Sequence, residues 1–408
     1  MRQAKAPHSP EKRPRILLIY RKMIPSIRLC GHCQMEYLSK QKKVEYRAIQ
    51  ELKLKKSDLN WADIVLLGRL DSWYECRLAK KLHEAGRYLI YIIDDDLLNV
   101  PPEISSASYY NQPCIQKNIL TMIELSDAIL SPSPILLRKY AVDGKHAIQI
   151  EEPAIEPVSY KPHNLNGPVK IGFAGSIDRE YDVENILKEA LLCISRKYSS
   201  DVKFEFYGGC LNFAAKMNAS YIPYSQSYLE YRRKLNGLNW DIGLAPIPST
   251  DFHSCKHYNK YIEYAAAGIL CVCSDLQPYA RLKGMVNSEL FAANTTESWV
   301  SRLEKLIDDP VYREQMRKEA IYHAHHEFNI CQIAETLEAK LRQKIVDKNK
   351  NRRKVACHLL FLKAGGCGVR AVWGAKKYGT KLLTLKKKQE RKEYNESRNS
   401  CGWIRDQN

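Results

Sequence analysis

The sequence lacks long hydrophobic runs. No stretch approaches the roughly 18 consecutive apolar residues that a membrane-spanning helix needs. The apolar run 16–20, which follows the basic N-terminal residues, is shorter than the hydrophobic core of a secretion signal. We therefore expect a cytoplasmic protein, and a peripheral position at the inner face of a membrane is compatible with this expectation.

Paired metal-binding cysteines are also lacking. The one Cys-x-x-Cys motif, Cys30 to Cys33, has no second pair at similar spacing, which a structural zinc site usually needs. The 13 cysteines are scattered, and several lie in apolar runs, as is typical of a chain in a reducing compartment. We expect ordinary thiols here rather than a zinc site or a redox pair.

The charge is strongly basic but unevenly distributed. The whole chain has a net charge of +18, and residues 346–408 hold 17 Lys and Arg against 5 Asp and Glu, which is +12. Such a tail attracts polyanions, and its interspersed apolar residues favour an amphipathic segment on an anionic membrane surface. A disordered basic tail is the equal alternative. No zinc-finger, helix-turn-helix or RNP pattern accompanies the charge, so we expect no specific nucleic-acid partner.

Short β-rich apolar runs alternate with longer amphipathic stretches throughout residues 15–345. The runs are 16–20, 64–67, 88–93, 128–131 and 147–150, then 169–174, 202–207, 241–245 and 269–273. They lack clean alternation, so both faces of each strand should be covered, and the intervals leave room for crossover helices. This pattern predicts an α/β protein with two Rossmann-like domains facing a cleft. Ligands of such sheets bind at the carboxyl ends of the strands.

The domain boundaries follow from changes in composition. Proline, asparagine and glycine between residues 153 and 168 are typical of a linker. We predict a basic N-terminal extension (1–14), a first Rossmann-like domain (15–160), a second (168–325), a helix (326–345) and a basic amphipathic or disordered tail (346–408).

The most informative segment lies between residues 251 and 275. Its spacing predicts one helix that begins after Ser254 as N-cap and ends at Gly268. Four polar residues fall on one face of this helix: Lys256, Asn259, Lys260 and Glu263. A helix N-terminus and lysines suit phosphate groups, and a carboxylate two turns along can accept hydrogen bonds from ribose hydroxyls. The alternative is a surface helix with an ordinary charge pair.

The run 260–275, KYIEYAAAGILCVCSD, resembles the signature of the retaining group 1 (family 4-like) glycosyltransferases, which have the GT-B fold. The resemblance covers residues 168–330 well and residues 15–150 in outline. It implies that Glu263 binds the donor ribose and that Lys256 and Lys260 act at the diphosphate. Cys255 departs from the pattern, because the family often has there a glutamate that helps to hold the donor sugar. The departure leaves the sugar open and keeps a catalytically degenerate GT-B protein as an alternative.

A second segment has the form strand, Gly175-Ser176, helix. Glycine lets the backbone approach a phosphate closely. In the resembling family this is the first loop of the donor domain, often with an arginine after the glycine. Here Ser176 takes that place, and Arg179 is the nearest cation. We predict donor-binding roles for Gly175, Ser176 and Arg179, with a tight turn and a solvated arginine as the alternative.

Three polar features flank the predicted cleft. Asp94, Asp95 and Asp96 end a strand of the first domain, and adjacent aspartates can bind hard cations. They lie far from the donor motif, so we expect no metal and predict that Asp95 and Asp96 line the acceptor side, with helix capping as the alternative. Arg28, in the first loop, is predicted to face the cleft. His253 is predicted to contact the donor, with a structural role as the alternative.

These features together predict sugar transfer from a nucleoside diphosphate sugar to an acceptor hydroxyl, with retention implied by the resemblance. The expected acceptor is a cell-surface polysaccharide or a lipid-linked glycan. The expected co-substrate is a UDP-linked or GDP-linked sugar, without a further cofactor. The first domain would hold the acceptor and the second the donor. A binding protein with a degenerate site is the main alternative.

Overall fold

The computed structural model describes residues 13–163, 165–176, 179–209 and 211–345. Residues 1–12 of the predicted extension 1–14, and the whole predicted tail 346–408, lie outside these residues. No helix in the described ranges combines the length and the apolar character that crossing a bilayer requires.

The first sheet has six parallel strands. Their order is β2 (Glu45–Gln50), β1 (Arg15–Tyr20), β3 (Ile64–Gly68), β4 (Tyr88–Ile92), β5 (Ala128–Ser131) and β6 (His146–Gln149). The central strands β3 and β4 are buried along their whole length, because helices cover both faces of the sheet. The five apolar runs predicted in this half are all strands, and β2 at the edge was not predicted.

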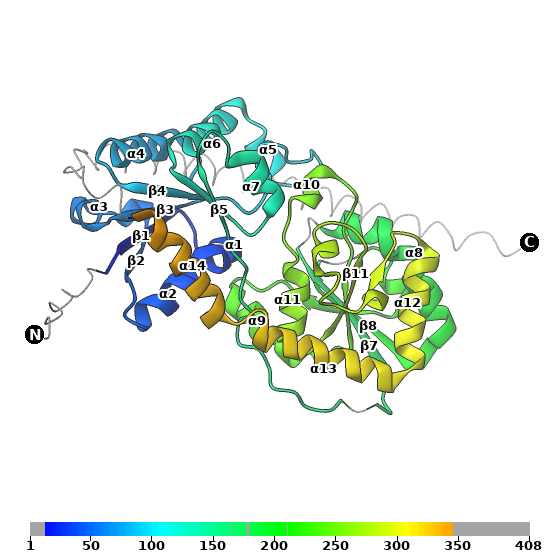
Figure 1. The fold of residues 1–408 in the computed structure, drawn as a ribbon. Coiled ribbons are helices and arrows are strands. Elements are labelled where there is room, and N and C mark those ends of the chain that lie inside the picture. The colour runs from blue at the N-terminus through cyan, green and yellow to red at the C-terminus, as the bar shows by residue number, and fades with distance from the viewer. Residues whose placement is uncertain (1–12, 164, 177–178, 210, 346–408) are drawn as a thin grey trace, which may run out of the picture. The chain divides into compact units, whose positions relative to one another are not determined.

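The second sheet also has six parallel strands. Their order is β12 (Phe291–Ala292), β11 (Leu270–Ser274), β10 (Ile242–Ala245), β7 (Val169–Gly175), β8 (Val202–Gly208) and β9 (Ser220–Pro223). The four predicted runs of this half are strands, and the two edge strands, β9 and β12, were not predicted. Two parallel sheets with flanking helices are the architecture predicted from the sequence (Figure 1).

Most of the helices lie between successive strands, and α12 and α13 follow the last strand, β12. In the first half they are α1 (Pro25–Ile27), η1 (Arg28–His32), α2 (Cys33–Lys40), η2 (Glu51–Lys53), α3 (Lys56–Trp61), α4 (Trp73–Glu84), α5 (Ala107–Tyr110), α6 (Pro113–Leu125) and α7 (Pro134–Tyr140). In the second half they are α8 (Glu180–Tyr198), η4 (Ser199–Asp201), η5 (Ala214–Met217), α9 (Tyr228–Gly237), α10 (Asp251–Ser254), α11 (Asn259–Ala266), η6 (Tyr279–Leu282), η7 (Ser288–Leu290), α12 (Thr296–Asp308) and α13 (Pro310–His326).

The last described helix, α14 (Ile330–Ile345), returns to the first sheet. Four of its apolar side chains belong to the same buried cluster as strands β1, β3, β4 and β5: Ile333, Ala334, Leu337 and Leu341. The helix lies beside α2 (Figure 1). The core of the first sheet is therefore built from both ends of the described chain.

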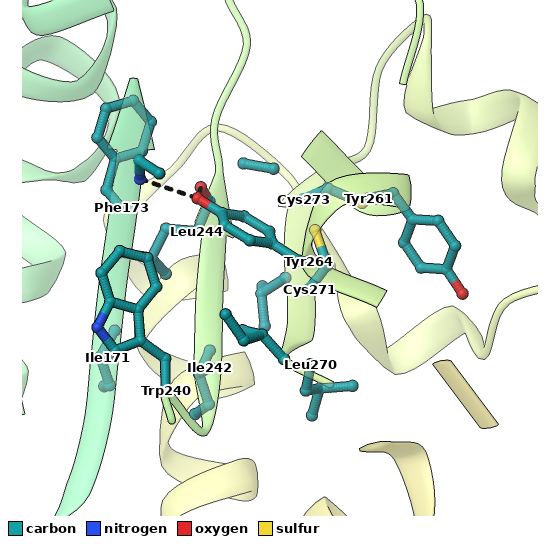
Figure 2. Packing of buried hydrophobic residues seen from close by; sticks show 14 of the residues in the cluster. Ile171, Phe173, Trp240, Ile242, Leu244, Tyr261, Tyr264, Leu270, Cys271 and Cys273 are labelled. Carbon is teal, nitrogen blue, oxygen red and sulfur yellow. Dashed lines mark hydrogen bonds between the residues drawn. The ribbon is translucent and has the colours of Figure 1, made fainter. Parts of the chain in front are cut away.

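Strands β7 and β10 are joined by a side chain where their ladder ends. They pair only through Ile242 with Ile171 and Gly243 with Gly172. Further along, the Tyr264 hydroxyl accepts a hydrogen bond from the Ala174 N–H at 3.0 Å and donates to the Leu244 carbonyl at 3.2 Å (Figure 2). Gly243 is required here, since a Cβ would lie 2.7 Å from the Tyr264 ring. One buried hydroxyl thus satisfies two backbone groups of diverging strands.

Replacing Tyr264 by Phe should destabilise the protein by about 1–3 kcal/mol, because it leaves a buried N–H and a buried carbonyl without partners. Thermal unfolding followed by circular dichroism measures the effect. Tyr322→Phe is the matched control, because Tyr322 is exposed on α13. Equal unfolding midpoints for the two variants would show that the Tyr264 hydroxyl is not needed.

Candidate functional site

Two cavities meet at the carboxyl ends of the second sheet. The first, called here the tyrosine cavity, has a volume of ≈ 410 Å³ and is lined by residues 22–25, 28, 175–176, 207–208, 224–229, 231, 260 and 263. The second, called the ionic cavity, has a volume of ≈ 270 Å³ and is lined by residues 26, 94–95, 152, 173, 175–176, 179, 245–247, 256–257, 259–260 and 279. Gly175, Ser176 and Lys260 line both. All site residues predicted from the sequence line one cavity or the other, except His253 and Asp96.

The prediction of one helix through residues 255–267 is wrong. Thr250, not Ser254, is the N-cap, and its hydroxyl accepts from the His253 N–H as α10 begins. Ser254 ends α10, and α11 begins only at Asn259. Residues 255–258 turn between the two helices. Tyr258 donates to Glu151 at 2.6 Å, a contact 107 residues apart in sequence that local periodicity cannot reveal.

Lys256 consequently does not share a helix face with Glu263. Its Nζ lies 2.7 Å from Asp95 Oδ1 and 4.4 Å from the centre of the Phe252 ring. Lys256 and Asp95 both line the ionic cavity. Although burial acts to raise it, the pKa of Asp95 is lowered by the positive charges of Lys256 and Arg69. The Asp95 carboxylate therefore stays ionised, and Lys256, which was predicted to bind the diphosphate, already contacts an anionic group.

Glu263 is a buried residue of α11 and lines the tyrosine cavity. Its Oε2 accepts from Tyr231 Oη at 2.9 Å and from Lys260 Nζ at 2.8 Å. Beneath it, buried Arg232 donates to the Glu263 carbonyl at 2.6 Å. Burial acts to raise the pKa of Glu263, but Lys260 and Arg232 lower it below the usual value. The carboxylate is therefore ionised and fixed in direction, as an acceptor for hydroxyl groups must be.

The loop after β7 brings backbone and cations to the junction of the two cavities. Gly175 has no room for a side chain, since a Cβ would lie 2.6 Å from the Phe173 ring. Arg179 precedes the first turn of α8 and donates to the Pro246 carbonyl at 3.0 Å. It lies 3.5 Å from Asp182, so its guanidinium is anchored at the rim of the ionic cavity. Its donor-binding role stays a prediction.

The three aspartates after β4 have different surroundings. Asp94 and Asp95 line the ionic cavity. Asp96 does not, contrary to the prediction: it is fully buried and accepts hydrogen bonds from Lys139 and Tyr140. Asp96 lies outside the cavity because its carboxylate is bound by these two side chains of α7.

His253 is also misplaced by the prediction. Its ring is buried, with Nδ1 2.8 Å from the Thr250 hydroxyl and Nε2 3.5 Å from Asp182. It supports the start of α10 and lines neither cavity. Arg28, by contrast, lines the tyrosine cavity and Asn259 lines the ionic cavity, and the roles of both stay predictions. Among the described residues, no group of His, Cys, Asp and Glu is arranged to hold a metal ion.

Sequence reasoning missed two contributions to the site. Tyrosines 207, 224, 228 and 231 line the tyrosine cavity together with Glu263, and only the frequency of tyrosine in residues 207–231 hinted at them. Glu152 also lines the ionic cavity, and no role was predicted for it. Burial raises its pKa to about 7. Its position directly after an apolar run was the available signal, because strand ends form the site.

The comparisons with known proteins place the fold. No protein-family model and no curated protein sequence matches the chain. Solved structures do match: HepE from Anabaena in complex with UDP-glucose (TM-score 0.56, 11% identity, 81% of this chain and 99% of that one) and a glycosyltransferase from Rickettsia africae ESF-5 (TM-score 0.54, 13% identity, 83% and 100%). A putative UDP-N-acetylglucosamine 2-epimerase from Listeria monocytogenes also matches (TM-score 0.51, 11% identity, 85% and 100%). At these identities the likeness shows the fold, and the chain has the GT-B fold.

The buried Glu152 should make the ligand-free protein less stable at higher pH. A carboxyl whose pKa rises from 4.5 to about 7 on folding binds a proton that the unfolded chain has lost between these values, so stability falls as pH rises through this window. Glu152→Gln removes the ionisation and should raise the free energy of unfolding by about 1–3 kcal/mol at pH 8.

The same substitution should change stability little at pH 4.5, because the carboxyl is then protonated in the folded protein. Thermal unfolding at pH 4.5, 6 and 8 tests the pH dependence. A destabilised Glu152→Gln at pH 8 would contradict the assigned cost of burying this charge.

Proposed function

We propose that this protein is a glycosyltransferase that takes a sugar from a nucleoside diphosphate sugar and passes it to an acceptor hydroxyl. The observation that carries the proposal is the arrangement around Lys260. This residue lines both cavities and is ion-paired to Glu263, beside the glycine loop that ends β7. The Glu263 carboxylate would face the ribose. The Lys260 ammonium group and the backbone of the glycine loop would face the diphosphate that follows the ribose in the nucleotide.

The nucleoside would occupy the tyrosine cavity. Its base can stack against aromatic rings such as Tyr228, and the two ribose hydroxyls can donate to the ionised Glu263 carboxylate. UDP is the first base to test, because the matching HepE structure contains UDP-glucose. A GDP-linked donor is the second.

The diphosphate would lie at the junction, against Ser176 and Lys260, with Lys256 and Arg179 on the ionic side. Negative charge develops on the departing diphosphate, and fixed positive groups stabilise it in the transition state. Lys256 would have to exchange its Asp95 partner for a phosphate oxygen. The acceptor hydroxyl would approach from the first domain, past Asp95 and Arg28.

The finer features of the proposal come from the sequence resemblance. They are retention at the anomeric carbon, and an acceptor that is a cell-surface polysaccharide or a lipid-linked glycan. The basic residues 346–408 would hold a cytoplasmic enzyme at the anionic inner face of a membrane, where such acceptors are assembled.

Calorimetric titration of UDP, GDP and TDP tests the donor site. We expect one nucleotide to bind the wild type and Glu263→Ala to weaken it tenfold or more, about 1.4 kcal/mol. Glu263→Gln keeps the shape of the side chain and should weaken binding similarly, since it removes the charge. Glu230→Ala is the matched control: Glu230 lies exposed on α9 and pairs with Lys234.

Activity is measured with the matching nucleotide sugar and followed by proton NMR. Release of nucleoside diphosphate together with a new α- or β-glycosidic signal gives the reaction and its stereochemistry. A product whose sugar is epimerised, or nucleotide binding without turnover of any donor, would contradict transfer. Unchanged binding in both Glu263 variants would show that the nucleotide lies elsewhere.

A further inference from the structure

The ionic cavity has two walls of opposite charge. The second domain contributes the cations Arg179, Lys256 and Lys260, and the segments after β4 and β6 contribute Asp94, Asp95 and Glu152. A ligand that fits both walls is anionic at one end and rich in neutral hydrogen-bond donors at the other. Hydroxyl groups are such donors, because they satisfy a carboxylate without adding charge.

The three carboxylates differ in the ion-pair partners that they already have within the protein. Asp94 Oδ1 lies 3.2 Å from Arg69 Nη1, and Asp95 Oδ1 lies 2.7 Å from Lys256 Nζ. Both aspartates are thus neutralised by cations within the protein.

Glu152 is different, because no lysine or arginine of the described residues forms an ion pair with it. Oε1 accepts from Cys30 Sγ at 2.9 Å, whereas Oε2 is buried with no hydrogen-bond partner among the described residues. The nearest ring nitrogen, His257 Nδ1, is 4.0 Å away and bonds Asn259 at 2.7 Å. A buried acceptor without a partner is costly, so a group in the cavity is expected to supply the missing donor.

We propose that Glu152 binds hydroxyl groups of the donor sugar and so determines which sugar the enzyme accepts. The proposal rests on the function proposed above, which places the diphosphate at the junction and hence the sugar in the ionic cavity. The acid that the sequence resemblance led us to look for at position 255 is replaced by Cys255, which is buried and lines neither cavity. Glu152 supplies a carboxylate from a different segment, directly after the first sheet.

Because Glu152 can lose its proton, this role should appear as a pH dependence of the affinity for the sugar. Its pKa near 7 results from burial, with His257 and Cys30 acting to lower it and Asp94 and Glu263 acting to raise it. The other titratable groups whose pKa responds to its charge are Cys33, Tyr228 and Tyr258. The ionised form accepts two hydroxyl donors better than the protonated form, so the affinity for the sugar should increase from pH 6 to pH 8.

Titration of UDP and UDP-glucose into the wild type and into Glu152→Gln tests the proposal. We expect UDP to bind the two proteins within about twofold, and UDP-glucose to bind the variant at least tenfold more weakly, about 1.4 kcal/mol. In the wild type, the ratio of the two affinities should increase between pH 6 and pH 8, and in the variant it should stay constant.

Glu156→Gln is the matched control, because Glu156 lies exposed shortly after Glu152 in the chain. Equal loss of UDP and UDP-glucose affinity in Glu152→Gln would indicate a merely structural role and overturn the proposal. A wild-type ratio of the two affinities that stays the same between pH 6 and pH 8 would also overturn the proposal. So would a wild type that binds UDP-glucose no more tightly than UDP. Absence of nucleotide binding in the wild type would instead overturn the donor site itself, and with it this proposal.

Discussion

The bond between the Tyr264 hydroxyl and strands β7 and β10 is the contact on which the candidate site depends. It holds the strands where their ladder has ended, and thereby fixes the α11 helix against the sheet. Glu263 precedes Tyr264, so once the tyrosine is anchored the carboxylate has one direction available, toward the tyrosine cavity. The neighbouring Arg232 holds the same turn through the Glu263 carbonyl. A parallel sheet opens at its carboxyl end, and here the side chain that closes the gap also positions the polar group beside it.

The fold was largely predictable because its central strands are buried on both faces. Each continuous apolar run, such as 64–67 in β3, is a strand in the structure. The strands that were missed, β2, β9 and β12, all lie at sheet edges. β2 is exposed or half-buried along its length and β12 has only two residues, so neither needs the apolar composition that marks a central strand. What the sequence pattern detects is burial on two sides.

The site was less predictable because its geometry depends on contacts between distant segments. Spacing alone placed Lys256 and Glu263 on one helix, whereas Glu151 draws Tyr258 and His257 into a turn between two helices. Glu152 was not singled out in the sequence, and only the folded chain encloses it with Cys30 and His257. The donor-binding role that the resemblance implies for the loop at Gly175 stays a prediction. Asp96 and His253, which were predicted from their positions in the chain, line neither cavity, because Lys139 and Thr250 hold their side chains elsewhere.

Helix α14 has a consequence for how the chain is made. All strands of the first sheet leave the ribosome early, but Ile333, Ala334, Leu337 and Leu341, which complete its core, follow about 180 residues after the last strand of that sheet. The apolar face of the first sheet that α14 covers therefore stays without this helix while the second sheet is synthesised. The second sheet can form its own core during that time. The half of the molecule that is translated first therefore completes its core last. A nascent chain that stalls before Ile330 exposes the apolar surface that α14 would cover.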